Sequence, residues 1–332
     1  MSLSAPRVLP KYKRDRIEHI IDKYFDVHLR DEDLDTAIPI YPINEDQSDQ
    51  MIFGGQLDPR LPQHPFRLLL IAPSGTGKTT MLVNMLIRPE MYCGYFNEVY
   101  ICSPSIYTDY KWKPVRDLYD DKDKPKYLLD HYDTSMVSTV VENQKTIIRE
   151  LDSHKELAPR ILLVFDDILA EKLFQVSTTG PLEDLFARGR QLNISVMVSS
   201  QFYKQISTRA RDNPTNIVLM NIGRNKKELK NVAEELSGPI SDKQFFTLWQ
   251  LMIDPKNPHD FMHIVAENNL KDERFRHRFS DSEPLPPLDE AQGDLLNSTE
   301  NERDDNGRKK GKKRKREEDQ EEVYYQKKKK GT

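Results

Sequence analysis

From residue 65 onward, two hydrophobic patterns alternate along the chain. Short continuous apolar runs of strand length cover residues 66–72, 98–102, 161–165, 194–199, 216–221 and 260–266. Between them, helical spacing of apolar positions covers residues 78–87, 135–151, 180–190, 226–236 and 242–252. Strands that are apolar on both faces and are separated by helices indicate a sheet covered by helices on both sides. We therefore predict an α/β fold with a mostly parallel central sheet.

The two ends of the chain have a different composition. Residues 1–60 predict an N-terminal leader, with a short basic helix over 11–25 followed by an acidic, proline-containing loop. From about residue 276 the chain is rich in Pro, Glu, Asp, Ser and Asn, and then in blocks of Lys and Arg. Such a segment cannot bury enough apolar surface to fold, so we predict a disordered charged tail over 276–332. Residues 61–275 remain as the folded domain.

The charge of the chain is unevenly distributed. The net charge is −4, but residues 307–332 hold 12 Lys and Arg against 5 Asp and Glu. The rest of the chain therefore holds 38 basic and 49 acidic residues, a net charge of −11. A nucleic acid would have to contact local loops or the tail rather than a basic surface. The basic cluster at 308–316 is either a nuclear localisation signal, a DNA anchor or a solvated charge run.

Cysteine content and hydropathy narrow the class of protein further. Cys93 and Cys102 are the only cysteines, and their spacing is not that of metal ligands. This usage is typical of a reduced intracellular compartment. No apolar run approaches the roughly 18 residues needed to span a bilayer, so we expect no membrane partner.

The turn between the first strand and the first helix carries a nucleotide-binding pattern. It reads Ala72-Pro73-Ser74-Gly75-Thr76-Gly77-Lys78-Thr79, with alanine in place of the first glycine of the phosphate-loop template. Glycines permit the tight bend, and the backbone N–H groups then converge on phosphates at the helix N-terminus. The alternative is a plain glycine turn, but the strand before it and the helix after it provide the context that a phosphate loop requires. The predicted ATP-binding residues are Pro73, Ser74, Gly75, Thr76, Gly77, Lys78, Thr79 and Thr80.

Two side chains of this loop have specific predicted roles. Lys78 would reach the β- and γ-phosphates, and Thr79 would bind Mg²⁺ through its hydroxyl.

The strand at 161–165 ends in Asp166 and Asp167, the Walker B pattern. Because unpaired buried carboxylates are costly, adjacent acids at a buried strand end indicate a cation. Asp166 would bind Mg²⁺ and Asp167 would act as general base, although Asp is also common as a helix N-cap.

Further catalytic candidates flank the strand at 194–199. Gln201 follows that strand and could sense the γ-phosphate, or it could be an ordinary polar residue at a strand end. An arginine finger would stabilise transition-state charge from an adjacent subunit. Arg190 and Arg211 are the selected candidates, with Arg188 and Arg209 beside them in the sequence. Each of these arginines could equally lie on the surface or contact DNA.

Taken together, these patterns resemble the genome-packaging ATPases of poxvirus-type DNA viruses, a branch of the FtsK–HerA superfamily of P-loop NTPases. The stretches that carry the resemblance are His64-Pro65-Phe66-Arg67, Tyr100-Ile101-Cys102-Ser103-Pro104-Ser105, Gly189-Arg190 and Arg211-Asp212-Asn213, together with the Asp pair and Gln201. The resemblance spans residues 50–270. It implies a RecA-like core that uses ATP and Mg²⁺, and a homo-oligomeric ring of five or six subunits around double-stranded DNA.

The same resemblance implies a biological setting and leaves other functions open. It predicts that ATP hydrolysis drives DNA into a preformed capsid, with a capsid or portal-vertex protein as partner. The protein would act in the nucleus or in a cytoplasmic virus factory, and it could enter the virion. The alternatives are a cellular-type DNA-pumping or repair ATPase of the same superfamily, and a P-loop kinase or nucleotide switch with residues 105–132 as a lid. A nucleic-acid-binding protein with a vestigial ATP site is disfavoured because Lys78, Thr79, Asp166 and Asp167 are all present.

Overall fold

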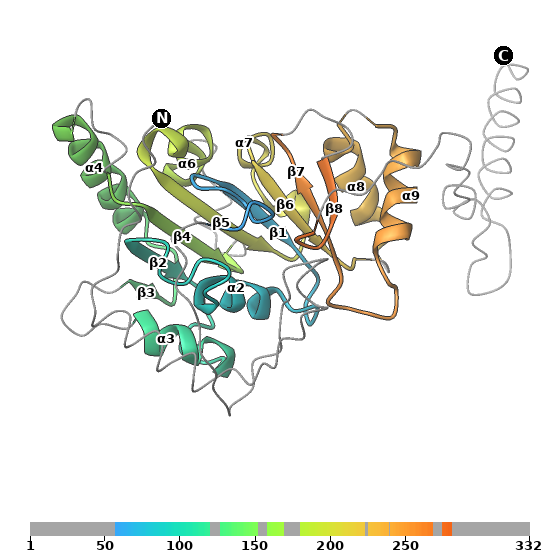
Figure 1. Ribbon diagram of the computed structural model, residues 1–332, viewed down its shortest axis with the longest axis horizontal. Coiled ribbons are helices and arrows are strands. Elements are labelled where there is room, and N and C mark those ends of the chain that lie inside the picture. Colours follow the sequence, from blue (N-terminus) through green and yellow to red (C-terminus); the bar gives the residue numbers. More distant parts are fainter. Residues whose placement is uncertain are drawn as a thin grey trace, which may run out of the picture.

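An eight-stranded sheet forms the centre of the structure (Figure 1). The computed structural model describes residues 57–119, 127–151, 158–168, 180–222, 225–238, 240–267 and 274–280. The strands are β1 Arg67–Ile71, β2 Glu98–Cys102, β3 Leu128–Leu129, β4 Ile161–Asp166, β5 Ile194–Ser200, β6 Asn216–Met220, β7 Phe261–Val265 and β8 Phe275–His277. Their order across the sheet is β3-β2-β4-β5-β1-β6-β7-β8.

The sheet is parallel except at one side. Strands β1 to β6 run in the same direction, whereas β7 pairs antiparallel with β6 and β8 antiparallel with β7. The parallel strands therefore all end at one edge, which we call the carboxyl edge, and all begin at the opposite, amino edge. Because β5 lies between β1 and β4, the loops that follow these three strands are neighbours at the carboxyl edge.

Helices cover both faces of this sheet (Figure 1). The helices are α2 Lys78–Ile87, α3 Lys113–Tyr119, α4 Thr134–Leu151, α6 Pro181–Arg188, α7 Thr208–Arg211, α8 Lys226–Leu236 and α9 Asp242–Met252. Three 3-10 turns, η2 Tyr110–Trp112, η5 Gly189–Leu192 and η6 Tyr203–Gln205, connect them to the strands. One face packs against α2 and α3, and the other against α4 and α6 to α9.

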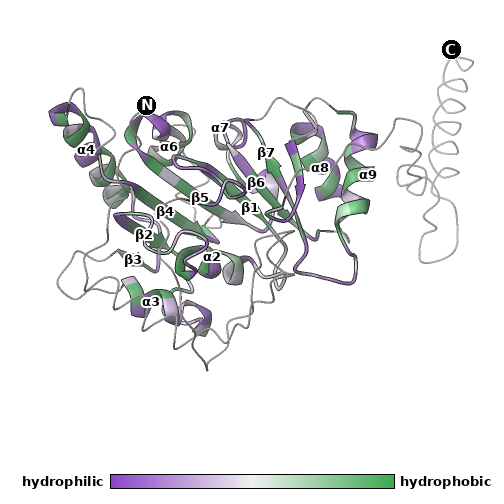
Figure 2. Ribbon diagram, viewed as in Figure 1, coloured by the Kyte–Doolittle hydropathy of each residue, from purple (hydrophilic) through white to green (hydrophobic). Residues whose placement is uncertain are grey.

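Alternating side chains of each strand supply the two hydrophobic cores. In β1, Leu68 and Leu70 face the α2 side, whereas Leu69 and Ile71 face the α4 side, and all four are fully buried. In Figure 2 the middle strands are mostly hydrophobic, while outer helices such as α4 carry both hydrophobic and hydrophilic positions. This two-sided burial explains why the strands appear in the sequence as continuous apolar runs.

The predicted elements agree closely with the observed ones, with informative exceptions. The six predicted strands and five predicted helices are present, with bounds that differ by a residue or two. The apolar pattern did not predict the short edge strands β3 and β8, nor the short helices α3 and α7. The packed core also extends past both predicted domain limits, because Leu57 and Phe279 are buried in it. Residues 276–280 of the predicted charged tail thus belong to β8 and the core, whereas the rest of that tail and the predicted leader helix lie outside the described residues.

The segment considered as a lid is part of the core where the structure describes it. Trp112 and Val115 are fully buried against the α2 side of the sheet, and Tyr119 donates a hydrogen bond to the carbonyl of Leu86 in α2. Residues 105–119 are therefore anchored in the fold rather than free to open.

Within the described chain, no helix combines the length and apolar character needed to cross a membrane.

Candidate nucleotide site at the carboxyl edge

The phosphate loop connects the end of β1 to the start of α2. The backbone N–H of Ala72 donates to the carbonyl of Ser200 (3.0 Å), which fastens the start of the loop to β5. Gly75 and Gly77 have φ angles of 81° and 102°, a left-handed conformation that favours glycine. Gly77 is the N-cap of α2 and makes no side-chain capping hydrogen bond. The first backbone N–H groups of α2 therefore donate to no capping side chain at the N-cap. An anion site at a helix N-terminus requires this arrangement.

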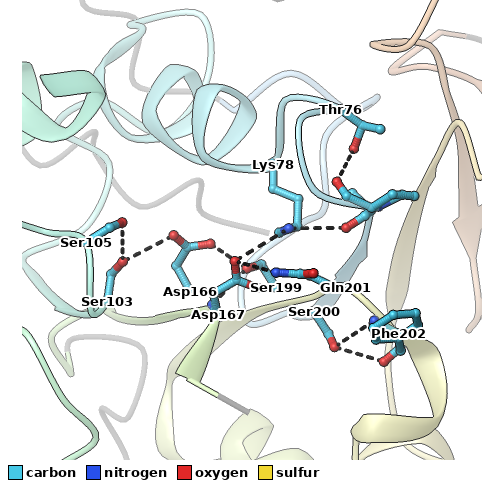
Figure 3. A network of polar contacts seen from close by, with 12 residues as sticks. Thr76, Lys78, Ser103, Ser105, Asp166, Asp167, Ser199, Ser200, Gln201 and Phe202 are labelled. Atoms are coloured by element: carbon cyan, nitrogen blue, oxygen red, sulfur yellow. Dashed lines mark hydrogen bonds and ion pairs between the residues drawn. The ribbon is translucent and has the colours of Figure 1, made fainter. Parts of the chain in front are cut away.

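Lys78 joins the phosphate loop to the acidic strand end. Its Nζ lies 3.2 Å from the carbonyl oxygen of Ala72 and 3.6 Å from Oδ2 of Asp167 (Figure 3). The lysine side chain is only 6% exposed. Its charge is thus held between the loop and the end of β4, where a negatively charged group would bind.

Asp166, the last residue of β4, is a buried carboxylate held by two hydroxyl groups. Ser199 donates to its Oδ1 and Ser103 donates to its Oδ2, the latter over 3.2 Å (Figure 3). Burial raises the pKa of Asp166 above its usual range, and the charge of Asp167 acts in the same direction. Hydrogen bonds from the two serines and the charge of Lys78 oppose this rise. A cation beside Asp166 would therefore relieve an unfavourable buried charge.

Asp167 points its carboxylate toward solvent, beside Gln201. Its side chain is 41% exposed and its φ is 54°, so the chain turns sharply directly after β4. Gln201 Nε2 donates to Asp167 Oδ2 over 3.3 Å, which is the same oxygen that faces Lys78 (Figure 3). The structure therefore brings together three predicted catalytic residues, from the start of α2 and the ends of β4 and β5.

The residues present fit Mg²⁺ better than a metal held by protein alone. Across the described ranges, no cluster of three or more His, Cys, Asp or Glu residues could hold a metal ion. Magnesium is usually bound by one or two carboxylates together with phosphate oxygens and water. Asp166 and the hydroxyl of Thr79, the second residue of α2, supply hard oxygen ligands of this kind.

Sequence reasoning missed the residues that orient Asp166. Ser103 was noted only as part of a family-like stretch, and Ser199 only as part of a strand. Behind them, Trp112 Nε1 donates to Ser105 Oγ (3.2 Å), which lies 3.2 Å from Ser103 Oγ. The available signal was positional, since both serines stand at strand ends that meet at the carboxyl edge.

The two selected arginines lie away from this constellation in their own subunit. Arg190 pairs with Glu267 (2.9 Å), which also binds Arg67 at the first residue of β1, so Arg190 lies at the amino edge. Arg211 lies 3.3 Å from Glu235 and 5.3 Å from the ring centroid of Tyr203. Arg188 is exposed at the end of α6, and Arg209 pairs with Asp184 (3.3 Å). A role for any of them in a neighbouring subunit's site stays a prediction.

Comparison with known proteins identifies relatives of this chain. The model of the poxvirus A32 protein family matches residues 58–283. The DNA packaging protein OPG160 of vaccinia virus (strain Copenhagen) is 27% identical over 210 residues, covering 62% of this chain and 70% of that protein. OPG160 of variola virus has the same identity and coverage.

Solved structures that resemble parts of this chain were also found. The genome packaging NTPase B204 of Sulfolobus turreted icosahedral virus 2, in complex with ATP-gammaS, has a TM-score of 0.40 and 11% identity. That match covers 67% of this chain and 98% of B204. EssC (ATPases 2 and 3) of Geobacillus thermodenitrificans has a TM-score of 0.43 and 13% identity, over 68% of this chain and 40% of that one.

Proposed function

Because the chain belongs to the poxvirus A32 protein family, we propose that it is an ATP-driven motor that packages double-stranded viral DNA into preformed capsids. The family match and the DNA packaging relatives support the biological role. One structural observation supports the ATPase activity: Lys78 and Gln201 converge on the same carboxylate oxygen of Asp167, directly beside the phosphate loop.

The proposed chemistry assigns one task to each residue of the site. The phosphate-loop N–H groups and Lys78 hold the phosphates and stabilise the charge that develops on the transferring group. Asp167 accepts a proton from the attacking water, and Gln201 orients that water and the Asp167 carboxylate. Water oxygen bonds to the γ-phosphorus while the bond to the β–γ bridging oxygen breaks, which yields ADP and phosphate. Mg²⁺, when bound by Thr79 and Asp166, neutralises phosphate charge.

For ATP hydrolysis to move DNA, some residue must connect the nucleotide site to the surface that contacts DNA, and Phe202 is a candidate for this connection. It follows Gln201 directly, and its side chain is 44% exposed. Its backbone N–H and carbonyl are both hydrogen-bonded to Ser200 Oγ, at 3.2 and 2.8 Å. These bonds hold Phe202 at the end of β5 directly beside Gln201, so a change in the backbone at Gln201 would also move Phe202. Since the body of the chain is acidic, DNA contacts belong to local loops such as this one.

The remaining features of the proposal concern assembly and location. We propose a homo-oligomeric ring of five or six subunits, in which Arg190 or Arg211 completes a neighbouring site, and a capsid vertex protein as docking partner. Relatives that are poxvirus DNA packaging proteins favour a cytoplasmic virus factory, and possible entry into the virion, over the nucleus. They also disfavour the cellular-type pump, while the anchored 105–119 segment disfavours a kinase with a lid there.

The decisive experiment measures ATP hydrolysis by the purified chain with and without linear double-stranded DNA. Low salt is needed because phosphate contacts weaken steeply as salt rises. We expect Mg²⁺-dependent turnover that DNA stimulates severalfold. The matched control is Lys145→Ala, since Lys145 pairs with Glu142 (2.7 Å) on the exposed side of α4 and has no assigned part in the site. Steady turnover that DNA leaves unchanged at every salt concentration would contradict the motor and favour a nucleotide switch.

A further inference from the structure

A histidine far along the chain contacts the phosphate loop. His259 belongs to the connection between α9 and β7, and its Nδ1 lies 2.9 Å from the carbonyl oxygen of Thr76. Because a carbonyl can only accept, Nδ1 must carry the proton and donate it. The two residues are 183 positions apart in the sequence. His259 as a residue is exposed, so burial in the core does not explain its place.

The geometry of the peptide bond gives this contact a consequence. In a trans peptide the carbonyl and the following N–H point in opposite directions within one plane. The hydrogen bond from His259 holds the Thr76 carbonyl on the side of the peptide that faces the imidazole. The N–H of Gly77 is therefore directed to the opposite side of the peptide, away from His259. This N–H is one of the donors that a phosphate loop uses to bind its anion.

Gly77 independently shows that the loop is built around this imidazole. A Cβ atom placed on Gly77 would lie 2.9 Å from His259 Nδ1, closer than real Cβ contacts occur. Gly77 also has a left-handed backbone conformation, which favours glycine for a separate reason. The close approach of His259 thus depends on the absence of a side chain at Gly77.

The segment that carries His259 is held rigidly. Asn221, just after β6, donates to the carbonyls of Asp254 (3.1 Å) and Asn257 (3.0 Å). Asn257 Oδ1 accepts from the backbone N–H of His259 (3.0 Å), and Asp260 Oδ2 accepts from that of Asp254 (2.9 Å). A fixed support of this kind can hold the phosphate loop in one conformation, whereas a flexible segment could not.

We infer that His259 is a positioning residue of the nucleotide site: it fixes the Thr76–Gly77 peptide so that the Gly77 N–H faces the phosphates before nucleotide binds. The inference rests on the proposed function only in that the loop binds a nucleoside polyphosphate. It assigns to His259 neither proton transfer nor contact with the base. Its predicted effect is therefore on affinity for phosphate, equally with or without an attached nucleoside.

The test compares three substitutions of His259 in the full-length chain by calorimetric binding of two probes. The probes are a non-hydrolysable ATP analogue and inorganic tripolyphosphate, both without Mg²⁺. We expect His259→Ala to weaken both by about tenfold, the usual worth of one lost hydrogen bond. His259→Asn places an amide N–H near the position of Nδ1 and should bind almost as tightly as wild type. His259→Gln places it farther out and should resemble the alanine variant.

The controls separate the possible failures. His131→Ala removes another exposed histidine and should bind both probes normally. His131 follows β3, and the strands β2, β4 and β5 lie between β3 and β1 in the sheet. Thermal unfolding without ligand checks that each variant folds; should alanine unfold the chain, the Asn-to-Gln difference decides. Equal tripolyphosphate affinity in wild type and His259→Ala, or a loss confined to the ATP analogue, would overturn the inference. Wild type that binds neither probe would instead overturn the proposed function.

Discussion

Both edges of the sheet carry buried polar groups, but the two sets are balanced differently. At the amino edge, His64 accepts from Ser195 through Nδ1 (2.6 Å) and donates to Asn193 through Nε2 (2.8 Å). Ser195 Oγ also accepts from the backbone N–H of Phe66 (3.0 Å). One neutral imidazole therefore provides both the acceptor for the Ser195 hydroxyl and the donor for the Asn193 carbonyl oxygen. Burial lowers the pKa of His64 to about 4, which keeps it neutral near pH 7.

At the carboxyl edge the polar groups are not balanced among themselves. Asp166 and Asp167 are adjacent carboxylates, and Lys78 is the nearby cation that opposes them. The N-terminus of α2 lacks a side-chain cap. Such a set is completed by a bound anion and a cation, whereas His64, Ser195 and Asn193 at the amino edge satisfy one another. The comparison teaches that burial of polar residues alone does not mark a functional site; at the carboxyl edge the mark is a pair of adjacent carboxylates beside a phosphate loop.

The largest expected effect is the loss of Lys78. Lys78→Ala removes the cation between the loop and Asp167, and we expect ATP turnover to fall by at least about a hundredfold. The free energy of unfolding should also fall, because the nearly buried lysine is the cation that opposes Asp166 and Asp167. Steady-state ATPase assays and urea unfolding measure the two quantities. Turnover near the wild-type rate would remove the central claim for this edge.

Removing the charge of Asp167 should separate binding from catalysis. We expect Asp167→Asn to lower kcat by about 10²- to 10⁴-fold, the usual contribution of a general base. Nucleotide affinity should stay within about twofold of wild type, since the loop and Lys78 remain. Asp167→Glu is the matched control and should recover part of the rate. Failure of Asp167→Asn to bind nucleotide would place Asp167 among the metal ligands instead.

Two serines of β5 allow the edges to be compared within one strand. Ser199 donates to Asp166 and accepts from the N–H of Asp167, whereas Ser195 serves His64 at the other end. Ser199→Ala should raise the Mg²⁺ concentration needed for half-maximal nucleotide binding by about tenfold. Ser195→Ala should leave that concentration unchanged and lower stability instead. A fluorescent nucleotide titrated with Mg²⁺ measures this, and equal shifts in both variants would contradict the distinction.

The smallest expected effect on activity comes from His64. His64→Ala leaves Ser195 and Asn193 without their partner, which should cost about 1–3 kcal/mol of stability and leave kcat unchanged. The pKa of His64 is about 4 in the fold against 6.5 as its ordinary value, so the unfolded chain binds more protons between these pH values. Its contribution is thus complete above pH 6.5 and is lost as pH falls toward 4.

The pH dependence gives a second measurement of the same residue. Wild-type unfolding free energy should fall as pH is lowered from about 6.5 to 4, and His64→Ala should fall less steeply. Burial also lowers the pKa of His263, to about 3, so some slope with the same sign will persist in the variant. Parallel pH profiles for wild type and variant would show that His64 is not neutral in the fold.

The sequence by itself determined the elements and the residues at their ends. Apolar runs located six of the eight strands because burial on both faces leaves a continuous signal. The phosphate loop, the Asp pair and Gln201 could be predicted from the sequence because each follows closely after such an apolar run. The strands β3 and β8, with two and three residues, are too short to give any period.

Only the tertiary structure decided which strand ends meet. The placement of β5 between β1 and β4 brings Gln201 to Asp167 and Ser199 to Asp166, and the chain order does not reveal it. The same holds for Arg190, which the fold places at the amino edge, and for His259, which it brings to Thr76 across 183 residues. Local sequence patterns encode local structure, whereas these contacts depend on strand order and on the packing of distant loops.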